Sequence, residues 1–120
     1  MIKQLASKDI KEYLKMGSNK KVLLDVRTVE ERDQSGSPDG EKLDLKTYFL
    51  TIKDENFVRE FKNIAISQDY EILTICGSGQ RSQFVAELLE KEDYNCVNIS
   101  DGFEGNGENI GWKNSGLPCL

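Results

Sequence analysis

Two short apolar runs constrain the fold of this chain more than any other feature. Residues 22–24 (Val-Leu-Leu) end at Asp25, and residues 72–75 (Ile-Leu-Thr-Ile) end at Cys76. A run that is apolar on both faces is typical of a strand buried on both sides, as in parallel sheets. Helical spacing of apolar residues occurs around these runs, and alternating strands and helices predict an α/β domain. We therefore expect a central, mainly parallel sheet with helices on both faces, formed by a single domain over residues 1–120.

The remaining elements follow from apolar spacing and from residues that cap or end helices. The most regular helical spacing lies within residues 82–91. The other expected elements are a strand over residues 2–5, a helix from the N-cap Ser7 to Gly17, a short turn capped by Thr28, a strand within residues 43–52, a helix capped by Asp54 and reaching residue 64 or 65, a strand over residues 96–99, and one helical turn around Trp112 in a long C-terminal connection.

Length, charge and hydropathy exclude several classes of protein. A chain of 120 residues removes roughly two thirds of its unfolded surface from water, so it needs no disulfide or metal to hold a core. The net charge of −5 and the pI near 4.8 disfavour a surface that tracks nucleic-acid phosphates. No segment approaches the ~18 consecutive apolar residues of a membrane helix, and residues 1–5 lack the apolar stretch of a signal peptide.

Charge and hydropathy also limit the kinds of binding partner. We expect neither nucleic acid nor a membrane. The chain as written predicts a cytoplasmic protein, or a periplasmic one if an export signal was removed from its precursor.

The sequence contains no histidine. Its absence excludes Ser-His-Asp and Cys-His nucleophile pairs, as well as zinc and copper sites with histidine ligands. The cysteines Cys76, Cys96 and Cys119 are separated by 20 and 23 positions without a C-x-x-C pair, which disfavours zinc and iron–sulfur sites. Their odd number disfavours a closed disulfide framework. We expect reduced thiols, no metal and no cofactor.

Cys76 stands at the carboxyl end of the second apolar run, and a glycine-containing turn leads from it into a helix. Ligand crevices of open α/β sheets lie at this edge, and the amino end of a helix favours an anion. Gly77 and Gly79 let the turn curl so that successive backbone N–H groups converge on the sulfur and stabilise a thiolate without histidine. Arg81 adds a permanent cation, and Ser82 adds a helix cap or a hydroxyl donor.

The alternative interpretation of Cys76 is a small buried hydrophobic residue, which is what most free cysteines are. A glycine turn or an arginine alone would not distinguish the two interpretations. The joint spacing of strand, glycines, arginine and helix favours the reactive one.

Three motifs resemble those of the rhodanese (sulfurtransferase) domain family. Residues 76–82, Cys-Gly-Ser-Gly-Gln-Arg-Ser, are similar to its C-x-x-G-x-R-S active loop, and residues 23–31, Leu-Leu-Asp-Val-Arg-Thr-Val-Glu-Glu, to its Asp-Val-Arg signature. Residues 101–103 (Asp-Gly-Phe), followed by Gly-Trp at 111–112 and Gly-Leu-Pro at 116–118, are similar to its closing motif. The matches span most of the chain in the family's order, so the resemblance implies a rhodanese-like fold.

One segment departs from the family. Residues 36–40, Gly-Ser-Pro-Asp-Gly, stand where the family commonly has His-Ile-Pro-Gly-Ala, and the stretch up to residue 52 matches nothing in it. The departure bears on loop shape and substrate access more than on activity.

The resemblance also implies a function. Cys76 would accept a sulfane sulfur as a persulfide, and the backbone of Gly77, Ser78, Gly79, Gln80 and Arg81 would cradle that sulfur, with Ser82 completing the loop. Arg81 would steer an anionic donor such as thiosulfate. A low-molecular-weight persulfide is the other implied donor, and the sulfur would pass to a thiol or protein acceptor.

Outside the loop, the same resemblance and the sequence pattern assign supporting roles. Asp25 and Arg27 resemble a structural pair near the site. Trp112 is expected to pack in the core or in a lid. Cys96 is expected to be buried and inert, and Cys119 to be exposed without an activating neighbour.

Two other functions stay open. Cysteine-dependent phosphatases and arsenate reductases on a related scaffold use a C-x5-R loop, whereas here four residues separate Cys76 from Arg81, and Ser82 occupies the phosphatase position. The smaller ring suits a single sulfur atom better than a tetrahedral phosphate. The other is a non-catalytic binding module, since a fold alone never implies activity. Such a module has no chemical reason to keep the cysteine in this setting, so the sequence favours sulfur transfer.

Overall fold

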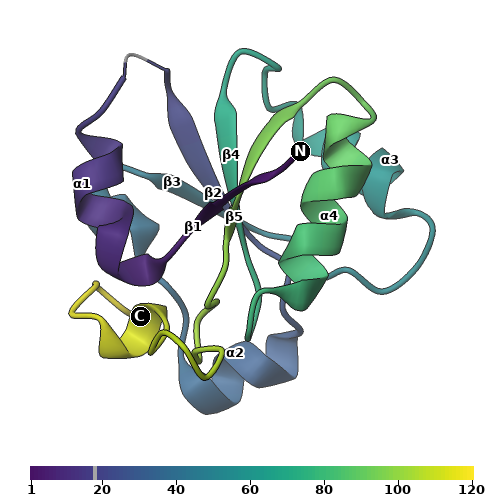
Figure 1. The fold of residues 1–120 in the computed structure, drawn as a ribbon. Coiled ribbons are helices and arrows are strands. Elements are labelled where there is room, and N and C mark those ends of the chain that lie inside the picture. The colour runs from purple at the N-terminus through teal and green to yellow at the C-terminus, as the bar shows by residue number, and fades with distance from the viewer. Residues whose placement is uncertain (18) are drawn as a thin grey trace.

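A parallel sheet forms the centre of the molecule in a computed structural model, which describes residues 1–17 and 19–120. Its five strands lie in the order β1-β5-β4-β2-β3 (Figure 1). Every pairing in this sheet is parallel, so the predicted fold class is confirmed. The strands are β1 (Lys3–Leu5), β2 (Lys21–Asp25), β3 (Lys46–Phe49), β4 (Glu71–Ile75) and β5 (Asn95–Ile99).

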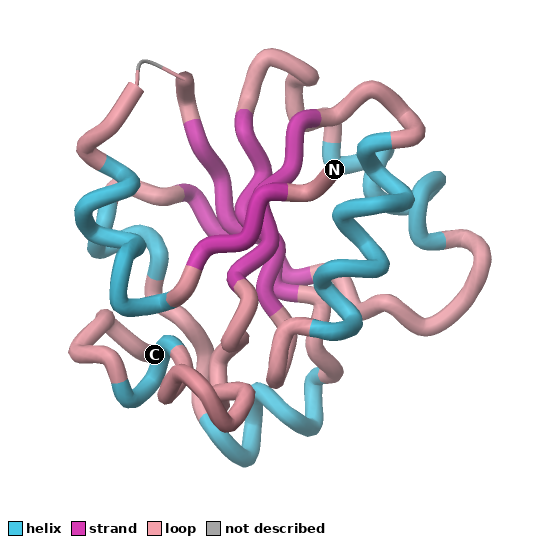
Figure 2. The backbone as a smooth tube through the Cα atoms, viewed as in Figure 1, coloured by secondary structure: helices cyan, strands magenta, loops and turns pink. Residues whose placement is uncertain are grey.

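Helices cover both faces of the sheet (Figure 2). They are α1 (Ile10–Leu14), α2 (Val29–Ser35), α3 (Phe57–Ile64) and α4 (Gln80–Glu90), with short 3-10 turns at Ser7–Asp9, Gly40–Leu43 and Trp112–Asn114. In Figure 1, α3 and α4 lie on one side of the sheet, and α1 lies on the other with the C-terminal segment. None of the described helices has the length and apolar character needed to cross a membrane.

The alternation of side chains along the strands divides the interior into two cores. Val22 and Leu24 of β2 pack in the core beneath α3 and α4, whereas Leu23 packs in the core beneath α1. The second core also contains Trp112, which is fully buried, as expected for core packing. Residues of a central strand must be apolar on both sides for this arrangement, which explains the continuous apolar runs of the sequence.

The register of the central strands places the site. Asp25, the last residue of β2, pairs with Ile75, the last residue of β4. The two strands therefore stop at the same level, at the lower edge of the sheet in Figure 1. Both following segments, α2 and the amino end of α4, start at that edge.

Several boundaries differ from the prediction. The strand expected within residues 43–52 is shorter, because the chain first makes the 3-10 turn Gly40–Leu43 and then passes through a left-handed residue, Asp44, with φ of 57°. The helix expected from Ser7 is also wrong in detail: Ala6 precedes a 3-10 turn, and α1 ends at Leu14. Ser7 is not a cap, since its N–H and hydroxyl both donate to Asp101 Oδ1, each at 2.9 Å.

Helix ends elsewhere gave mixed results. The Thr28 cap is confirmed, and Thr28 forms a complete capping box with Glu31 at the start of α2. Helix α3 begins after Asn56, and the predicted cap Asp54 instead accepts a hydrogen bond from the Asn56 N–H. Helix α4 begins at Gln80, two positions before the predicted start at Ser82.

Candidate active site

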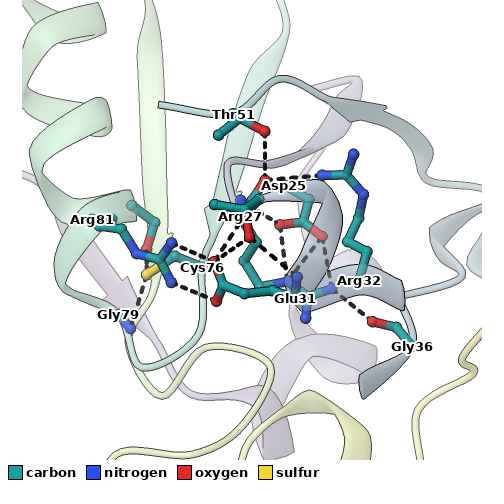
Figure 3. A network of polar contacts seen from close by, with 11 residues as sticks. Asp25, Arg27, Glu31, Arg32, Gly36, Thr51, Cys76, Gly79 and Arg81 are labelled. Atoms are coloured by element: carbon teal, nitrogen blue, oxygen red, sulfur yellow. Dashed lines mark hydrogen bonds and ion pairs between the residues drawn. The ribbon is translucent and has the colours of Figure 1, made fainter. Parts of the chain in front are cut away.

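Cys76 follows β4 directly, and residues 77–79 carry the chain into α4 (Figure 3). Gly79 is the residue before the helix and has φ of 101°, a conformation that favours glycine. A β-carbon on Gly79 would lie 2.1 Å from the Ser100 carbonyl oxygen. The glycine is therefore required both by its own backbone conformation and by the close approach of the chain after β5.

Two donors contact the sulfur of Cys76. The Gly79 N–H lies 3.1 Å from Sγ, and the Ser82 hydroxyl lies 3.3 Å from it. Cys76 is only 1% exposed. Among the described residues, one backbone N–H, that of Gly79, donates a hydrogen bond to the sulfur. The sequence had predicted that several N–H groups between Gly77 and Arg81 would converge on it. The N–H groups of the first turn of α4 lack partners within the helix and keep the local potential positive.

The Ser82 hydroxyl also contacts Asn98 of β5. Its oxygen lies 2.6 Å from Asn98 Oδ1, and the Asn98 amide donates to the carbonyl of Gly79 at 3.1 Å and to Gln4 Oε1 at 2.9 Å. A hydroxyl has one hydrogen, so Ser82 gives it to the nearer Asn98 oxygen while Cys76 is a thiol. An ionised sulfur, 3.3 Å from the hydroxyl oxygen, would compete with Asn98 for that hydrogen. Sequence reasoning missed Asn98, whose only signal was a polar residue within a buried strand.

Arg81 does not stand free at the loop. Its Nη1 lies 2.6 Å from Glu31 Oε1, and its Nη2 lies 2.8 Å from Glu31 Oε2, a two-bond ion pair between α4 and α2 (Figure 3). Hydrogen bonding from Arg81 lowers the pKa of Glu31 to about 2, with burial opposing the shift and the Thr28 N–H adding to it. The same hydrogen bond raises the pKa of Arg81. Glu31 belongs to the motif of residues 23–31, but no neighbouring residue in the sequence indicates that it pairs with Arg81.

Asp25 and Arg27 form a second ion pair, which is fully buried. Nε of Arg27 lies 3.2 Å from both carboxylate oxygens, and Nη2 lies 3.0 Å from Asp25 Oδ2 and 2.9 Å from the Gly36 carbonyl. The guanidinium carbon lies 4.3 Å from the centre of the Phe103 ring. These contacts join the end of β2 to neighbouring loops, the arrangement expected of a structural pair.

The Asp-Gly-Phe motif holds the base of the active loop. The N–H of Phe103 donates to the Cys76 carbonyl and the N–H of Glu104 to the Gly77 carbonyl, both at 2.8 Å. Gly102 has φ of 63°, and a β-carbon there would lie 2.4 Å from the Gly77 carbonyl oxygen. The buried Asp101 anchors the motif by accepting hydrogen bonds from Ser7 and from the Gly111 N–H. The sequence pointed to this motif, but not to its contact with the loop.

Ser78 and Gln80 are exposed on the outside of the loop. With Gly79 they border a pocket of about 530 Å³ that reaches Asn98.

The other two thiols lie outside the active loop. Cys96 is buried in β5, and Cys119 is exposed near the C-terminus, as expected.

A cysteine at the carboxyl edge of a parallel sheet, in the turn that leads into the amino end of a helix, defines a class of α/β proteins with a thiol in the strand-to-helix loop. The model of the rhodanese-like domain matches residues 9–108. This chain belongs to the rhodanese-like domain family, and the resemblance seen in the sequence is confirmed.

Several proteins are similar to this chain in sequence or in fold. The uncharacterized protein RP600 of Rickettsia prowazekii (strain Madrid E) is 41% identical over 104 residues, which cover 84% of each chain. The crystal structure of Rv0390 from M. tuberculosis superposes with a TM-score of 0.79 at 28% identity, over 98% of this chain and 96% of that one. A structure titled a protein of unknown function, RPA3614, possible tyrosine phosphatase, from Rhodopseudomonas palustris CGA009 has a TM-score of 0.64 at 19% identity, over 99% and 85% of the two chains.

Proposed function

We propose that this protein is a sulfurtransferase that carries sulfane sulfur on Cys76 and passes it to a thiophilic acceptor. The observation that carries the proposal is the setting of Sγ, 3.1 Å from the Gly79 N–H at the amino end of α4. An anionic sulfur is favoured at this position, and both a thiolate and a persulfide are anionic sulfur.

The reaction needs no group outside the loop except the two substrates. The Cys76 thiol first loses its proton to solvent. Its thiolate attacks the outer sulfur of thiosulfate, the S–S bond of the donor breaks, and sulfite leaves with two negative charges. Cys76 then holds the outer sulfur as a persulfide anion. An acceptor thiolate attacks that sulfur, takes it as its own persulfide, and restores the Cys76 thiolate.

The loop residues support these steps in different ways. The Gly79 N–H and the Ser82 hydroxyl supply hydrogen bonds to developing negative charge on sulfur. The N–H groups of Phe103 and Glu104 donate hydrogen bonds to the carbonyls of Cys76 and Gly77. These bonds hold the loop in place in the absence of substrate. Asp25 and Arg27 act as positioning residues at the end of β2.

Phosphatase chemistry fits this loop less well. A phosphatase loop must surround a tetrahedral oxyanion with several donors, and its recurring pattern places five residues between cysteine and arginine. Here four intervene, and the arginine is paired with Glu31. The likeness to the Rhodopseudomonas structure, at 19% identity, concerns the fold alone.

Mass spectrometry of the intact protein after incubation with thiosulfate tests the proposal. We expect the protein to gain one sulfur atom, and Cys76→Ser to gain none. Cys96→Ser and Cys119→Ser are matched controls that should load like the parent, because Cys96 belongs to β5 and Cys119 lies near the C-terminus, outside the loop. A binding module would gain no sulfur. Loading that persists in Cys76→Ser would overturn the assignment of the carrier.

A further inference from the structure

The ion pair between Arg81 and Glu31 lies directly over the active loop. A β-carbon built on Gly77 would stand 3.2 Å from Arg81 Nη2 and 3.5 Å from Glu31 Oε2. Gly77 is the residue next to Cys76, so both charges of the pair lie beside the backbone that holds the sulfur. The two side chains are 42% and 33% exposed, which places them at the solvent side of the loop.

Glu31 is fixed from behind by its own helix. Its Oε1 accepts hydrogen bonds from the Thr28 N–H at 3.1 Å and from the Thr28 hydroxyl at 3.2 Å. The Thr28 N–H bond is one half of a capping box, and the Glu31 N–H completes it by donating to the Thr28 hydroxyl oxygen at 3.1 Å. The box orients the side chain at the third position of α2. The carboxylate therefore stays beside Arg81 as part of the fold instead of meeting it by chance on a flexible surface.

The pairing changes the charge that an incoming donor meets. A lone arginine would attract a dianion, but the carboxylate of Glu31 cancels that charge within hydrogen-bond distance. Asp25 and Arg27 cancel each other in the same way. These four side chains contribute no net charge, so the helix end and the Gly79 N–H, which act at short range, become a larger part of the attraction for an anion.

We propose that Glu31 is a specificity-determining residue, which neutralises Arg81 and so favours sulfur donors of low net charge, such as alkyl persulfides, over thiosulfate. This inference rests on the sulfurtransferase function proposed above. With a persulfide donor, the Cys76 thiolate attacks the outer sulfur of R–S–S⁻, the S–S bond breaks, and the thiolate R–S⁻ leaves. The charge is conserved, and no oxidant or reductant is consumed.

Glu31→Gln tests this role with little disturbance of the fold. Glutamine serves in a capping box as glutamate does, so its oxygen can still accept from Thr28, while the negative charge and the hydrogen bond between Arg81 Nη2 and Oε2 are lost. Rate constants of sulfur loading are measured by mass spectrometry with two donors: thiosulfate, a dianion, and 2-aminoethyl persulfide, whose ammonium group makes it neutral overall. We expect the ratio of the thiosulfate rate to the persulfide rate to rise about tenfold in the variant at low ionic strength. The gain should shrink as salt screens the charges.

Glu92→Gln is the matched control. Glu92 forms an ion pair with Lys62 at 2.5 Å, beyond the far end of α4, and its side chain is as exposed as that of Glu31. The control changes the net charge by the same amount and should leave the ratio of the two rates unchanged.

The outcomes separate the two proposals. Loading with an unchanged ratio in Glu31→Gln, or an equal rise in Glu92→Gln, would overturn the role of Glu31 and leave the sulfurtransferase function standing. Failure of the folded parent to take sulfur from either donor would overturn the function itself.

Discussion

At the scale of single residues, the three thiols of this chain have different surroundings. Burial, with the charges of Glu90 and Glu71 adding to it, raises the pKa of Cys96 to about 12. Burial also raises the pKa of Cys119, with Asp39 contributing. Cys76 differs from both in having a backbone N–H aimed at its sulfur.

We therefore expect Cys76 to react first with a small alkylating agent. At neutral pH iodoacetamide should modify Cys76 before the others, because a thiolate is the reacting form and the Gly79 N–H at the amino end of α4 favours an anionic sulfur. A raised pKa keeps the other two thiols protonated at neutral pH, so Cys119 should gain reactivity only in alkaline solution and Cys96 later still. Peptide mapping after timed alkylation gives the order. Modification of Cys119 ahead of Cys76 at neutral pH would contradict a loop that favours anionic sulfur.

A second prediction concerns Ser82. Ser82→Ala removes one of the two contacts of Sγ and leaves Asn98 Oδ1 without its 2.6 Å partner. We expect sulfur loading to slow by roughly tenfold and the free energy of unfolding to fall by about 1–2 kcal/mol. Mass spectrometry of samples quenched at timed intervals measures the rate of sulfur loading, and denaturant titration measures the free energy of unfolding. Ser78→Ala is the control, since Ser78 is exposed on the same loop. Equal loading by the Ser82 and Ser78 variants would show that the hydroxyl is dispensable.

At the scale of elements, the loop between β4 and α4 depends on the chain that follows β5. Gly79 lies against Ser100, and Gly102 lies against Gly77 and Cys76. The loop is therefore shaped by close backbone approaches from a segment more than twenty positions later in the sequence. Side chains at these two glycines would push the elements apart.

Substitution at Gly79 should show this dependence. Gly79→Ala places a β-carbon 2.1 Å from a carbonyl oxygen in a backbone conformation that alanine rarely adopts, so we expect a loss of about 3 kcal/mol or more in stability and no sulfur loading. Gly107→Ala is matched in φ, which is 91°, but nothing lies within 4 Å of its β-carbon. That control should lose only about 1–2 kcal/mol and keep its activity. Comparable losses in both variants would mean that backbone strain alone acts at Gly79.

Features encoded by adjacent residues could be predicted from the sequence, whereas contacts between distant segments could not. The central strands, the Thr28 cap and the position of the turn after Cys76 were predictable, because apolar runs, a capping residue and glycines mark them locally in the sequence. The shape of that turn was not, because it depends on contacts with residues 100–102. The partner of Arg81 was not, since Glu31 lies 50 positions away and meets it only after α2 and α4 are placed. Asn98 was missed for a similar reason, because its contact with Ser82 depends on β5 pairing with β4 in one register. The range predicted for β3 was too long, because apolar alternation does not reveal a left-handed residue such as Asp44.

At the scale of the whole molecule, the ion pair of Glu31 and Arg81 joins α2 to α4 across the edge of the sheet (Figure 3). The chain has no histidine, so carboxyl groups dominate its response to acid. Among them, Glu31 has a pKa lowered to about 2 from an ordinary 4.5.

Acid should therefore weaken the fold through Glu31. Because its pKa is lower in the folded than in the unfolded chain, the unfolded chain binds the proton first as the pH falls. The stabilisation is complete above the ordinary value of 4.5 and is lost as the pH falls toward 2. Thermal unfolding from neutral pH down to that range should show a steeper fall in Tm for the parent than for Glu31→Gln. Glu30→Gln, an exposed neighbour on α2, is the control. Parallel curves for the parent and Glu31→Gln would contradict the lowered pKa.

The hydrogen bonds from Phe103 and Glu104 to the carbonyls of Cys76 and Gly77 have a practical consequence. Both amide protons are held by the active loop, although they belong to a different segment of the chain. Their exchange with deuterated solvent can occur only when the loop separates from that segment. The two amides thus report the opening of the sulfur site in every variant, including Cys76→Ser, in which no sulfur chemistry remains to be followed.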